Sequence, residues 1–227
     1  MAIDIVDTKH AFLSFGLPSG IDTFDHWAFG TADGGSTWTA RAFTVPAQAT
    51  NMPDVLGIYF LTPTLGVFEF QLVVQSTKTG WGSWKSPTVL PAMWNEPPVT
   101  FLGTSNWAMP GPYDSSSSTI GYATSFNQGT SWTVHTATLP TIPDQNDASL
   151  TFLGQFNWVL QLSTTTVTTT YATHDGATTW TKVGNQPFLG KARFIDMNHA
   201  WLWSPDGPLE VTSNGGVNWQ LVTPGIW

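Results

Sequence analysis

The stretch TADGGSTW, Thr31–Trp38, spaces an Asp, two glycines and a Trp in a way that indicates a tight turn entering a β-strand. The same frame returns as SFNQGTSW (Ser125–Trp132), THDGATTW (Thr173–Trp180) and TSNGGVNW (Thr212–Trp219). STKTGWGSW (Ser76–Trp84) is a looser copy that carries one extra residue. The turn therefore recurs about every 45 residues, and a repeat of this period decides the fold class.

A second phrase recurs between these turns and indicates a strand, a turn and another strand. Its copies are IVDTKHAF (Ile5–Phe12), FLTPTLGVF (Phe60–Phe68), FLGTSNW (Phe101–Trp107), FLGQFNW (Phe152–Trp158) and FIDMNHAW (Phe194–Trp201). The two phrases together supply four strands per repeat, which matches one blade of a β-propeller. The sequence therefore predicts an all-β fold, a five-bladed β-propeller with four antiparallel strands in each blade.

The five predicted blades span roughly residues 2–46, 54–91, 98–140, 148–187 and 191–227. No linker separates them, so we expect residues 1–227 to form a single domain with a shared core. Three tryptophans that end copies of the second phrase are expected to occupy equivalent core positions. These are Trp107, Trp158 and Trp201.

The stretch TADGGSTW resembles the Asp box, or bacterial neuraminidase repeat, whose pattern is Ser/Thr-x-Asp-x-Gly-x-Thr-Trp/Phe. FIDMNHAW followed by such a turn is similar to the repeats of photosystem assembly factor and sortilin-type propellers. The resemblance implies a β-propeller in which each box fastens the outer strands of a blade. It is specific for architecture and gives little guidance on activity.

The third position of the box calls for a short side-chain acceptor that binds backbone N–H groups, while Gly supplies the unusual backbone angle. Asp33 and Asp175 keep a carboxylate there, Asn127 and Asn214 substitute an amide, and Lys78 cannot accept a hydrogen bond. A metal or catalytic site would not tolerate these changes. We therefore expect the boxes to be structural fasteners.

Sialidases carry Asp boxes, so the resemblance also raises sialidase activity. Sialidases hold the carboxylate of their sugar with three arginines, whereas this chain contains only Arg41 and Arg193. Lysine cannot supply the same bidentate geometry. The prediction is therefore that the protein is not a sialidase.

Charge and composition exclude several partners. The formal net charge is -8 and the seven Lys and Arg residues are scattered singly, so we expect no binding to nucleic acid or to an anionic membrane surface. No apolar run is long enough to span a bilayer, and the chain has no Cys, which excludes membrane insertion and disulfides. We expect no cofactor, and the composition favours an extracellular or cell-surface location.

The predicted ligand-binding face is acidic. In a propeller, the loops between blades share a face with the loops that join the second and third strands, here Leu17–Asp25 and Pro110–Ser118 among others. Eight of the 15 acidic residues fall in such loops: Asp22, Asp25, Asp54, Glu96, Asp114, Asp144, Asp147 and Asp206. The aromatic residues Phe24, Trp94 and Tyr113 lie in the same loops.

Carboxylates beside exposed aromatic rings suit a neutral sugar, because the hydroxyl groups need acceptors and the apolar ring faces stack. The alternative without a ligand is that the acidic loops only keep the protein in solution and that Trp94 caps the core. The predicted ligand-binding residues are Trp94, Glu96, Tyr113, Asp114, Asp54 and Asp147.

An enzymatic alternative rests on Asp54, Glu96 and Asp147, which precede the first strands of three blades and should crown the central channel. Five-bladed glycosidases of the arabinanase and invertase types place three carboxylates there. Glycoside hydrolysis needs a proton donor and a second carboxylate roughly 5–10 Å away. The flanking motifs of those enzymes are absent here, and no EF-hand spacing indicates a Ca²⁺ site, so we predict no metal.

The histidines support no catalytic arrangement. His10 and His199 occupy matching repeat positions, which favours structural roles, and no Ser-His-Asp order can be recognised. The sequence therefore predicts a noncatalytic binding module, with carbohydrate as the preferred ligand in a lectin-like role. The alternatives are a glycoside hydrolase and a protein-binding scaffold or assembly factor.

Overall fold

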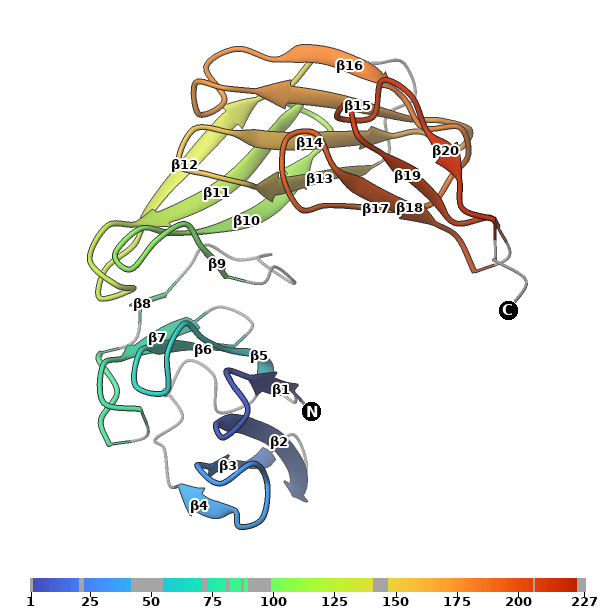
Figure 1. Ribbon diagram of the computed structural model, residues 1–227. Helices are drawn as coiled ribbons and strands as arrows, with labels where there is room; N and C mark the ends of the chain where they lie inside the picture. Colours follow the sequence, from blue (N-terminus) through green and yellow to red (C-terminus); the bar gives the residue numbers. More distant parts are fainter. Residues whose placement is uncertain are drawn as a thin grey trace. The chain divides into compact units, whose positions relative to one another are not determined.

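The computed structural model describes residues 2–20, 23–41, 55–70, 73–80, 82–86, 88–89, 99–140, 147–205 and 207–223. These residues form β-strands, turns and bends, with no helix among them. The strands make five sheets of four strands each (Figure 1). This confirms the prediction of an all-β fold with four antiparallel strands per repeat, and five sheets fit five blades.

Each sheet takes its four strands from one continuous stretch of the chain and pairs them in sequence order. The strands of the first three sheets are β1 (Ala2–Ile5), β2 (Ala11–Gly20), β3 (Thr23–Thr31) and β4 (Thr39–Arg41); β5 (Val55–Phe60), β6 (Gly66–Phe70), β7 (Val73–Thr77) and β8 (Thr88–Val89); and β9 (Thr100–Phe101), β10 (Trp107–Asp114), β11 (Thr119–Ser125) and β12 (Thr133–Thr138). The last two sheets contain β13 (Asp147–Phe152), β14 (Trp158–Ser163), β15 (Thr168–Thr173) and β16 (Thr181–Asn185); and β17 (Lys191–Phe194), β18 (Ala200–Trp203), β19 (Glu210–Thr212) and β20 (Gln220–Leu221).

The chain divides into two compact units, each described here by itself. The first unit is Met1–Pro112 with Tyr122–His135, and the second is Tyr113–Gly121 with Thr136–Trp227. Sheets β1–β4 and β5–β8 belong to the first unit, and sheets β13–β16 and β17–β20 belong to the second. The sheet β9–β12 has residues in both.

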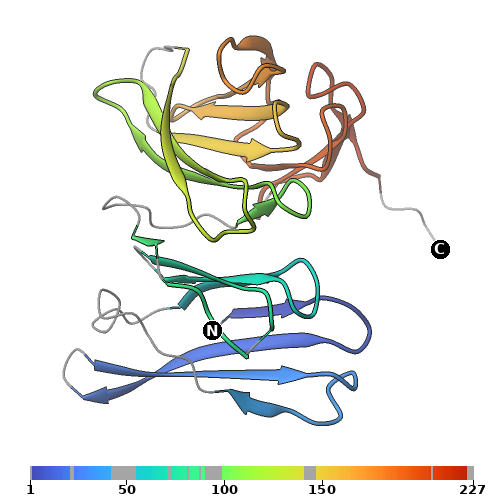
Figure 2. The same ribbon diagram turned by 90° about the vertical axis from the view of Figure 1, so that its left-hand side faces the viewer.

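The core of the first unit lies where consecutive sheets pack face to face. Strands β1 and β5 lie side by side (Figures 1 and 2), and Phe12 of β2 stacks on Phe60 of β5 with ring centroids 3.7 Å apart. A second cluster gathers Val67, Trp107 and Met109, all of which are almost fully buried. Burial of these large apolar side chains is the main stabilising contribution to the unit.

The core of the second unit follows the same plan. Val159 of β14 packs with Phe194 of β17 and Ala200 of β18. All but the last residue of β14 are buried, as expected of a strand covered on both faces.

The prediction that Trp107, Trp158 and Trp201 are equivalent is wrong for Trp201. Trp107 and Trp158 are 1% and 4% exposed, whereas Trp201 is 41% exposed. In the strand register, Trp107 lies opposite Phe101 and Trp158 lies opposite Phe152. In the last sheet, the residue opposite Phe194 is Ala200 rather than Trp201. FIDMNHAW is one residue longer than the other two copies, and a shift of one residue turns a strand side chain to the opposite face.

The repeated turns are built around the hydroxyl group at their first position. In Thr31–Trp38, the Thr31 Oγ1 accepts a hydrogen bond from the Gly35 N–H (2.9 Å) and donates one to Asp33 Oδ1 (2.8 Å). The Asp33 carboxylate then accepts from the Thr37 N–H (2.9 Å) and the Thr37 hydroxyl (2.6 Å). Two side chains, Thr31 and Asp33, therefore hold the backbone of the turn through the N–H groups of Gly35 and Thr37.

Asn127 and Asn214 replace the carboxylate without loss of the turn. Their Oδ1 atoms accept from the N–H groups of Ser131 and Asn218, each at 2.9 Å, as Asp33 does from Thr37. The amide supplies the acceptor that these positions require, so the charge is dispensable there.

The second copy of the turn corrects the sequence alignment. Thr79 Oγ1 accepts from the Ser83 N–H at 2.9 Å, and the Thr79 N–H donates to Thr77 Oγ1 at 3.2 Å. Thr79, rather than Lys78, therefore occupies the acceptor position. The copy starts at Thr77 and contains no extra residue.

Each turn is also tied to the turn between the first two strands of its own sheet. The residue after the acceptor donates its N–H to a backbone carbonyl there in all five sheets. These pairs are Gly34 to Lys9, Gly80 to Thr64, Gln128 to Ser105, Gly176 to Phe156 and Gly215 to Asn198, at 2.7–3.2 Å. The two recurring phrases of the sequence are therefore bonded to each other.

Candidate functional site

Three of the six predicted ligand-binding residues are described, and all three lie in the second unit. Tyr113 and Asp114 end strand β10, and Asp147 begins strand β13. Trp94, Glu96 and Asp54 lie outside the described residues, as do Asp22, Asp144 and Asp206.

Two predicted loops are shorter than expected. Strands β2 and β3 stay paired as far as Gly20 and Thr23, so Phe24 and Asp25 are strand residues. Strand β10 likewise runs to Asp114 through most of the predicted loop. The sequence signal was misread because Pro and Gly in these stretches indicated a loop, whereas a strand can accommodate both at an irregular or edge position.

Tyr113, Asp114 and Asp147 lie close enough to influence one another electrostatically. Loss of surrounding water, followed by the negative charges of Asp114 and Asp147, raises the pKa of the Tyr113 hydroxyl. The Tyr113 side chain is partly exposed, and both carboxylates are exposed. The structure therefore brings together three of the six predicted ligand-binding residues.

Asp114 is held in place by its own turn. Its Oδ1 accepts from the hydroxyl (2.7 Å) and the N–H (2.9 Å) of Ser116, and its Oδ2 accepts from the hydroxyl of Ser117 (2.8 Å). These hydrogen bonds lower the pKa of Asp114, which stays ionised at neutral pH. The result is a fixed, ionised carboxylate that can accept hydrogen bonds from ligand hydroxyl groups.

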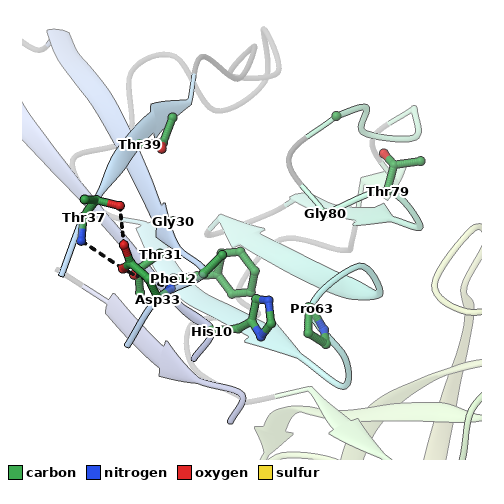
Figure 3. Close-up of a pocket in the computed structure, with 12 residues that line it drawn as sticks. His10, Phe12, Gly30, Thr31, Asp33, Thr37, Thr39, Pro63, Thr79 and Gly80 are labelled. Carbon is green, nitrogen blue, oxygen red and sulfur yellow. Dashed lines mark hydrogen bonds between the residues drawn. The ribbon is translucent and has the colours of Figure 1, made fainter. Parts of the chain in front are cut away.

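A polar pocket of about 430 Å³ lies in the first unit between the turn Thr31–Trp38 and the loops of the second sheet. Figure 3 shows the Asp33 and Thr37 side chains on one wall, Thr79 on the opposite wall, and Phe12 and His10 between them. Sequence reasoning missed this pocket, because it is assembled from turns of two different sheets. Its lining could bind a small hydroxylated molecule.

The polar groups of this pocket are largely engaged already. The hydrogen bonds from Thr37 and Thr31 lower the pKa of Asp33 to about 2. His10 Nδ1 lies 3.0 Å from both carboxylate oxygens of Asp7, which also accepts from the backbone N–H groups of Lys9 and His10. His199 and Asp196 repeat this arrangement, so it recurs as a local structural element of the fold.

A buried carboxyl group in the first unit was not recognised from the sequence. Glu69 of β6 is 2% exposed, and burial raises its pKa to about 8. The signal was present in GVFEF, Gly66–Phe70, since strand alternation places Glu69 on the same face as Val67, which faces the core. A charged residue at such a position is unusual.

Among the described residues, no three His, Asp or Glu side chains are grouped so as to hold a metal ion. The described part of the chain also contains no helix that is long and apolar enough to cross a membrane.

No protein-family model matches the chain, and no curated protein matches it. Solved structures do match. YCF48 from Cyanidioschyzon merolae aligns with a TM-score of 0.59 at 13% identity, covering 97% of this chain and 84% of that one. The GH74 xyloglucanase from Xanthomonas campestris gives 0.57 at 17% identity over 98% of this chain, and the GH74 enzyme from Niastella koreensis gives 0.57 at 14% over 94%.

This chain spans 32% and 31% of the two GH74 chains. At these identities the likeness concerns the fold alone. The neighbours are β-propellers, and together with the five four-stranded sheets they support a β-propeller fold for this chain.

Proposed function

We propose that the five sheets are the blades of one five-bladed β-propeller, a single domain whose repeated turns are Asp boxes. The consecutive four-stranded sheets and the propeller neighbours support this assignment. The hydrogen bonds within the turns, and those from each turn to the first hairpin of its sheet, support a fastening role for the boxes.

We propose further that the protein is a noncatalytic binding module for carbohydrate, with a lectin-like role outside the cell or at its surface. The observation that carries this proposal is that Tyr113 and Asp114 end β10, with Asp147 of β13 near enough for its charge to act on the Tyr113 hydroxyl. A tyrosine ring offers an apolar face to a sugar, and the carboxylates accept hydrogen bonds from its hydroxyl groups. The Ser116 and Ser117 hydrogen bonds fix Asp114 in advance, which reduces the entropy lost on binding.

The state of Asp114 argues for binding rather than catalysis. A glycosidase needs one carboxyl group that carries a proton near the working pH. The hydrogen bonds that lower the pKa of Asp114 make it a poor proton donor. The glycoside-hydrolase alternative therefore depends on Asp54, Glu96 and Asp147.

The test is a glycan-array screen followed by titration of tryptophan fluorescence, with wild type, Tyr113→Ala and Asp114→Asn. We expect saturable binding to a neutral glycan and at least about a tenfold loss of affinity in each variant, which corresponds to roughly 1.4 kcal/mol. Phe156→Ala, which removes an exposed ring from the β13–β14 turn, is the control and should bind as wild type does.

Equal binding by wild type and both variants would contradict the site, and failure to bind any glycan would contradict the ligand class. Cleavage of a bound glycan that is lost in Glu96→Gln would support the hydrolase instead.

A protein-binding scaffold or assembly factor is the second candidate. Ile195 and Trp201 line one pocket of the second unit, and grouped apolar exposure marks protein-interaction surfaces. Large apolar side chains of this unit are exposed. Four of them are more than half exposed: Phe156, Ile195, Val217 and Leu221. A partner that is cross-linked to wild type but not to Ile195→Asp, without any glycan binding, would favour this role.

A further inference from the structure

Glu69 is a charged residue type in a position built for an apolar one. It lies in β6 directly opposite Gly57 of β5 and Val74 of β7. It is 2% exposed, and its Oε2 has no hydrogen-bond partner among the described residues. A buried carboxylate in this state would carry a large desolvation penalty.

The neighbours of Glu69 make ionisation still less favourable. A Cβ on Gly57 would overlap the ring of Tyr59, so this ring lies over Gly57, beside Glu69. The apolar cluster around Val67, with which Tyr59 also packs, lies on the same face of the sheet.

Within the described part of the chain, the titratable groups that face this region are Tyr59 from β5 and Asp4 from β1; Val74, opposite in β7, cannot titrate. Burial first, and then the charges of Glu69 and Asp4, raise the pKa of Tyr59. Burial likewise raises the pKa of Asp4, despite the hydrogen bond that it accepts from the Phe60 N–H. Neither neighbour carries a positive charge, so no described group that faces Glu69 offsets a charge on it.

We propose that Glu69 is an internal proton-binding site, which keeps its proton in the folded protein at neutral pH and loosens the packing of sheet β5–β8 when it ionises. The protonated carboxyl group can be buried at modest cost, whereas a carboxylate in the same place would have no donor for its Oε2 among the described residues. The inference is independent of which ligand the protein binds.

The direction of the pH dependence follows from the raised pKa. The pKa of Glu69 rises from 4.5 to about 8 on burial, while the unfolded chain releases this proton near the ordinary value. The folded state thus binds more protons than the unfolded state between these values. The stability linked to Glu69 is complete below the ordinary pKa, falls as the pH rises and levels off above about pH 8.

Carboxyl NMR tests the proton site directly in wild-type protein. The chain contains three glutamates, Glu69, Glu96 and Glu210, so a sample with ¹³C-labelled glutamate gives three side-chain signals to follow. We expect one signal to titrate above pH 7 and to be missing in Glu69→Gln. If that variant does not fold, Glu96→Gln and Glu210→Gln assign the signal by elimination. Titration of all three signals in the ordinary range of glutamate would overturn the proposal.

Thermal unfolding between pH 5 and pH 9 tests the consequence. We expect the Tm of wild type to fall with rising pH and the curve of Glu69→Gln to be flatter, whatever its absolute Tm. The control Glu210→Gln, at a partly exposed position in β19, should keep the wild-type slope. Identical slopes for wild type and Glu69→Gln would show that ionisation of Glu69 does not loosen the sheet.

Discussion

At the scale of single residues, the hydroxyl group of Thr31 is central to the hydrogen bonding of the repeated turn Thr31–Trp38. Thr31 is 5% exposed, and its Oγ1 takes part in hydrogen bonds with Asp33 and with the N–H groups of Asp33 and Gly35. The Asp33 carboxylate accepts hydrogen bonds from this hydroxyl group and from Thr37.

Thr31→Val keeps the shape of the side chain and removes these hydrogen bonds, which leaves two backbone N–H groups without their acceptor. We expect a loss of about 1–3 kcal/mol in the free energy of unfolding, measured by urea denaturation. Ser36→Ala in the same turn removes one exposed hydrogen bond to the Asp33 carbonyl and should change stability by less than about 0.5 kcal/mol. Equal effects of the two changes would refute the assigned role.

The two carboxylates of the turns should stabilise the protein only above strongly acidic pH. Hydrogen bonds led by the Thr37 and Thr179 hydroxyl groups lower the pKa values of Asp33 and Asp175 to about 2. A lowered pKa gives stability that is present above the ordinary value and lost as the pH falls through about 2.

Asp33→Asn/Asp175→Asn copies the amides that the chain already uses at Asn127 and Asn214. The urea midpoint of the double variant should therefore fall less than that of wild type between pH 5 and pH 2. A parallel fall in both proteins would show that these carboxylates do not contribute to acid denaturation.

At the scale of the elements, four of the five turns show two consecutive residues with positive φ. The pairs are Gly34 and Gly35, Gln128 and Gly129, Gly176 and Ala177, and Gly215 and Gly216, with φ between 63° and 96°. The left-handed region costs a non-glycine residue about 1 kcal/mol or more. Gln128 and Ala177 adopt this conformation although they are not glycine.

Substitutions at the fifth position of two turns should change the free energy of unfolding in opposite directions. Ala177→Gly relieves the left-handed conformation and should stabilise the protein by about 0.5 kcal/mol, because the gain exceeds the added freedom of the unfolded chain. Gly129→Ala should cost about 2–3 kcal/mol, since its Cβ would lie 2.5 Å from the Trp107 ring. Denaturation midpoints that shift in the same direction would contradict this reading.

The register of the strands and turns is the feature of the elements that the sequence did not predict correctly. Trp201 aligns by eye with Trp107 and Trp158, yet one additional residue in its hairpin turns it to the other face, where it is 41% exposed. The second turn was misaligned in the same way, with Lys78 in the place of Thr79. Both errors are shifts of one residue. For Trp201, which lies in a strand, the shift reverses the face of the side chain.

At the scale of the whole molecule, the proposed single five-bladed domain has a direct measure. A compact domain of 227 residues should have a radius of gyration of about 17 Å. We expect this value in solution scattering, together with a single calorimetric transition whose van't Hoff and calorimetric enthalpies agree. Two transitions, or a clearly larger radius, would show instead that the two compact units unfold and move independently.

The local repeats made much of the architecture predictable. Strand and turn signals act over a few residues, so the five four-stranded sheets and their order could be derived from the spacing of two phrases. The candidate site was predicted only in part. The charges of Asp114 and Asp147 act on Tyr113, while the role of these three residues in ligand binding and the positions of Trp94, Glu96 and Asp54 stay predictions.

The sequence by itself determined the number of repeats, the strand content and the turn chemistry, because each depends on residues close together in the chain. Only the tertiary structure decided which face Trp201 occupies, which turns enclose the pocket beside Asp33, and that Glu69 is buried with no partner for its Oε2 among the described residues. These features depend on register and on side chains brought from other sheets. The pKa of Glu69 is the clearest case, since the same carboxyl group in a solvated strand would be ionised at neutral pH.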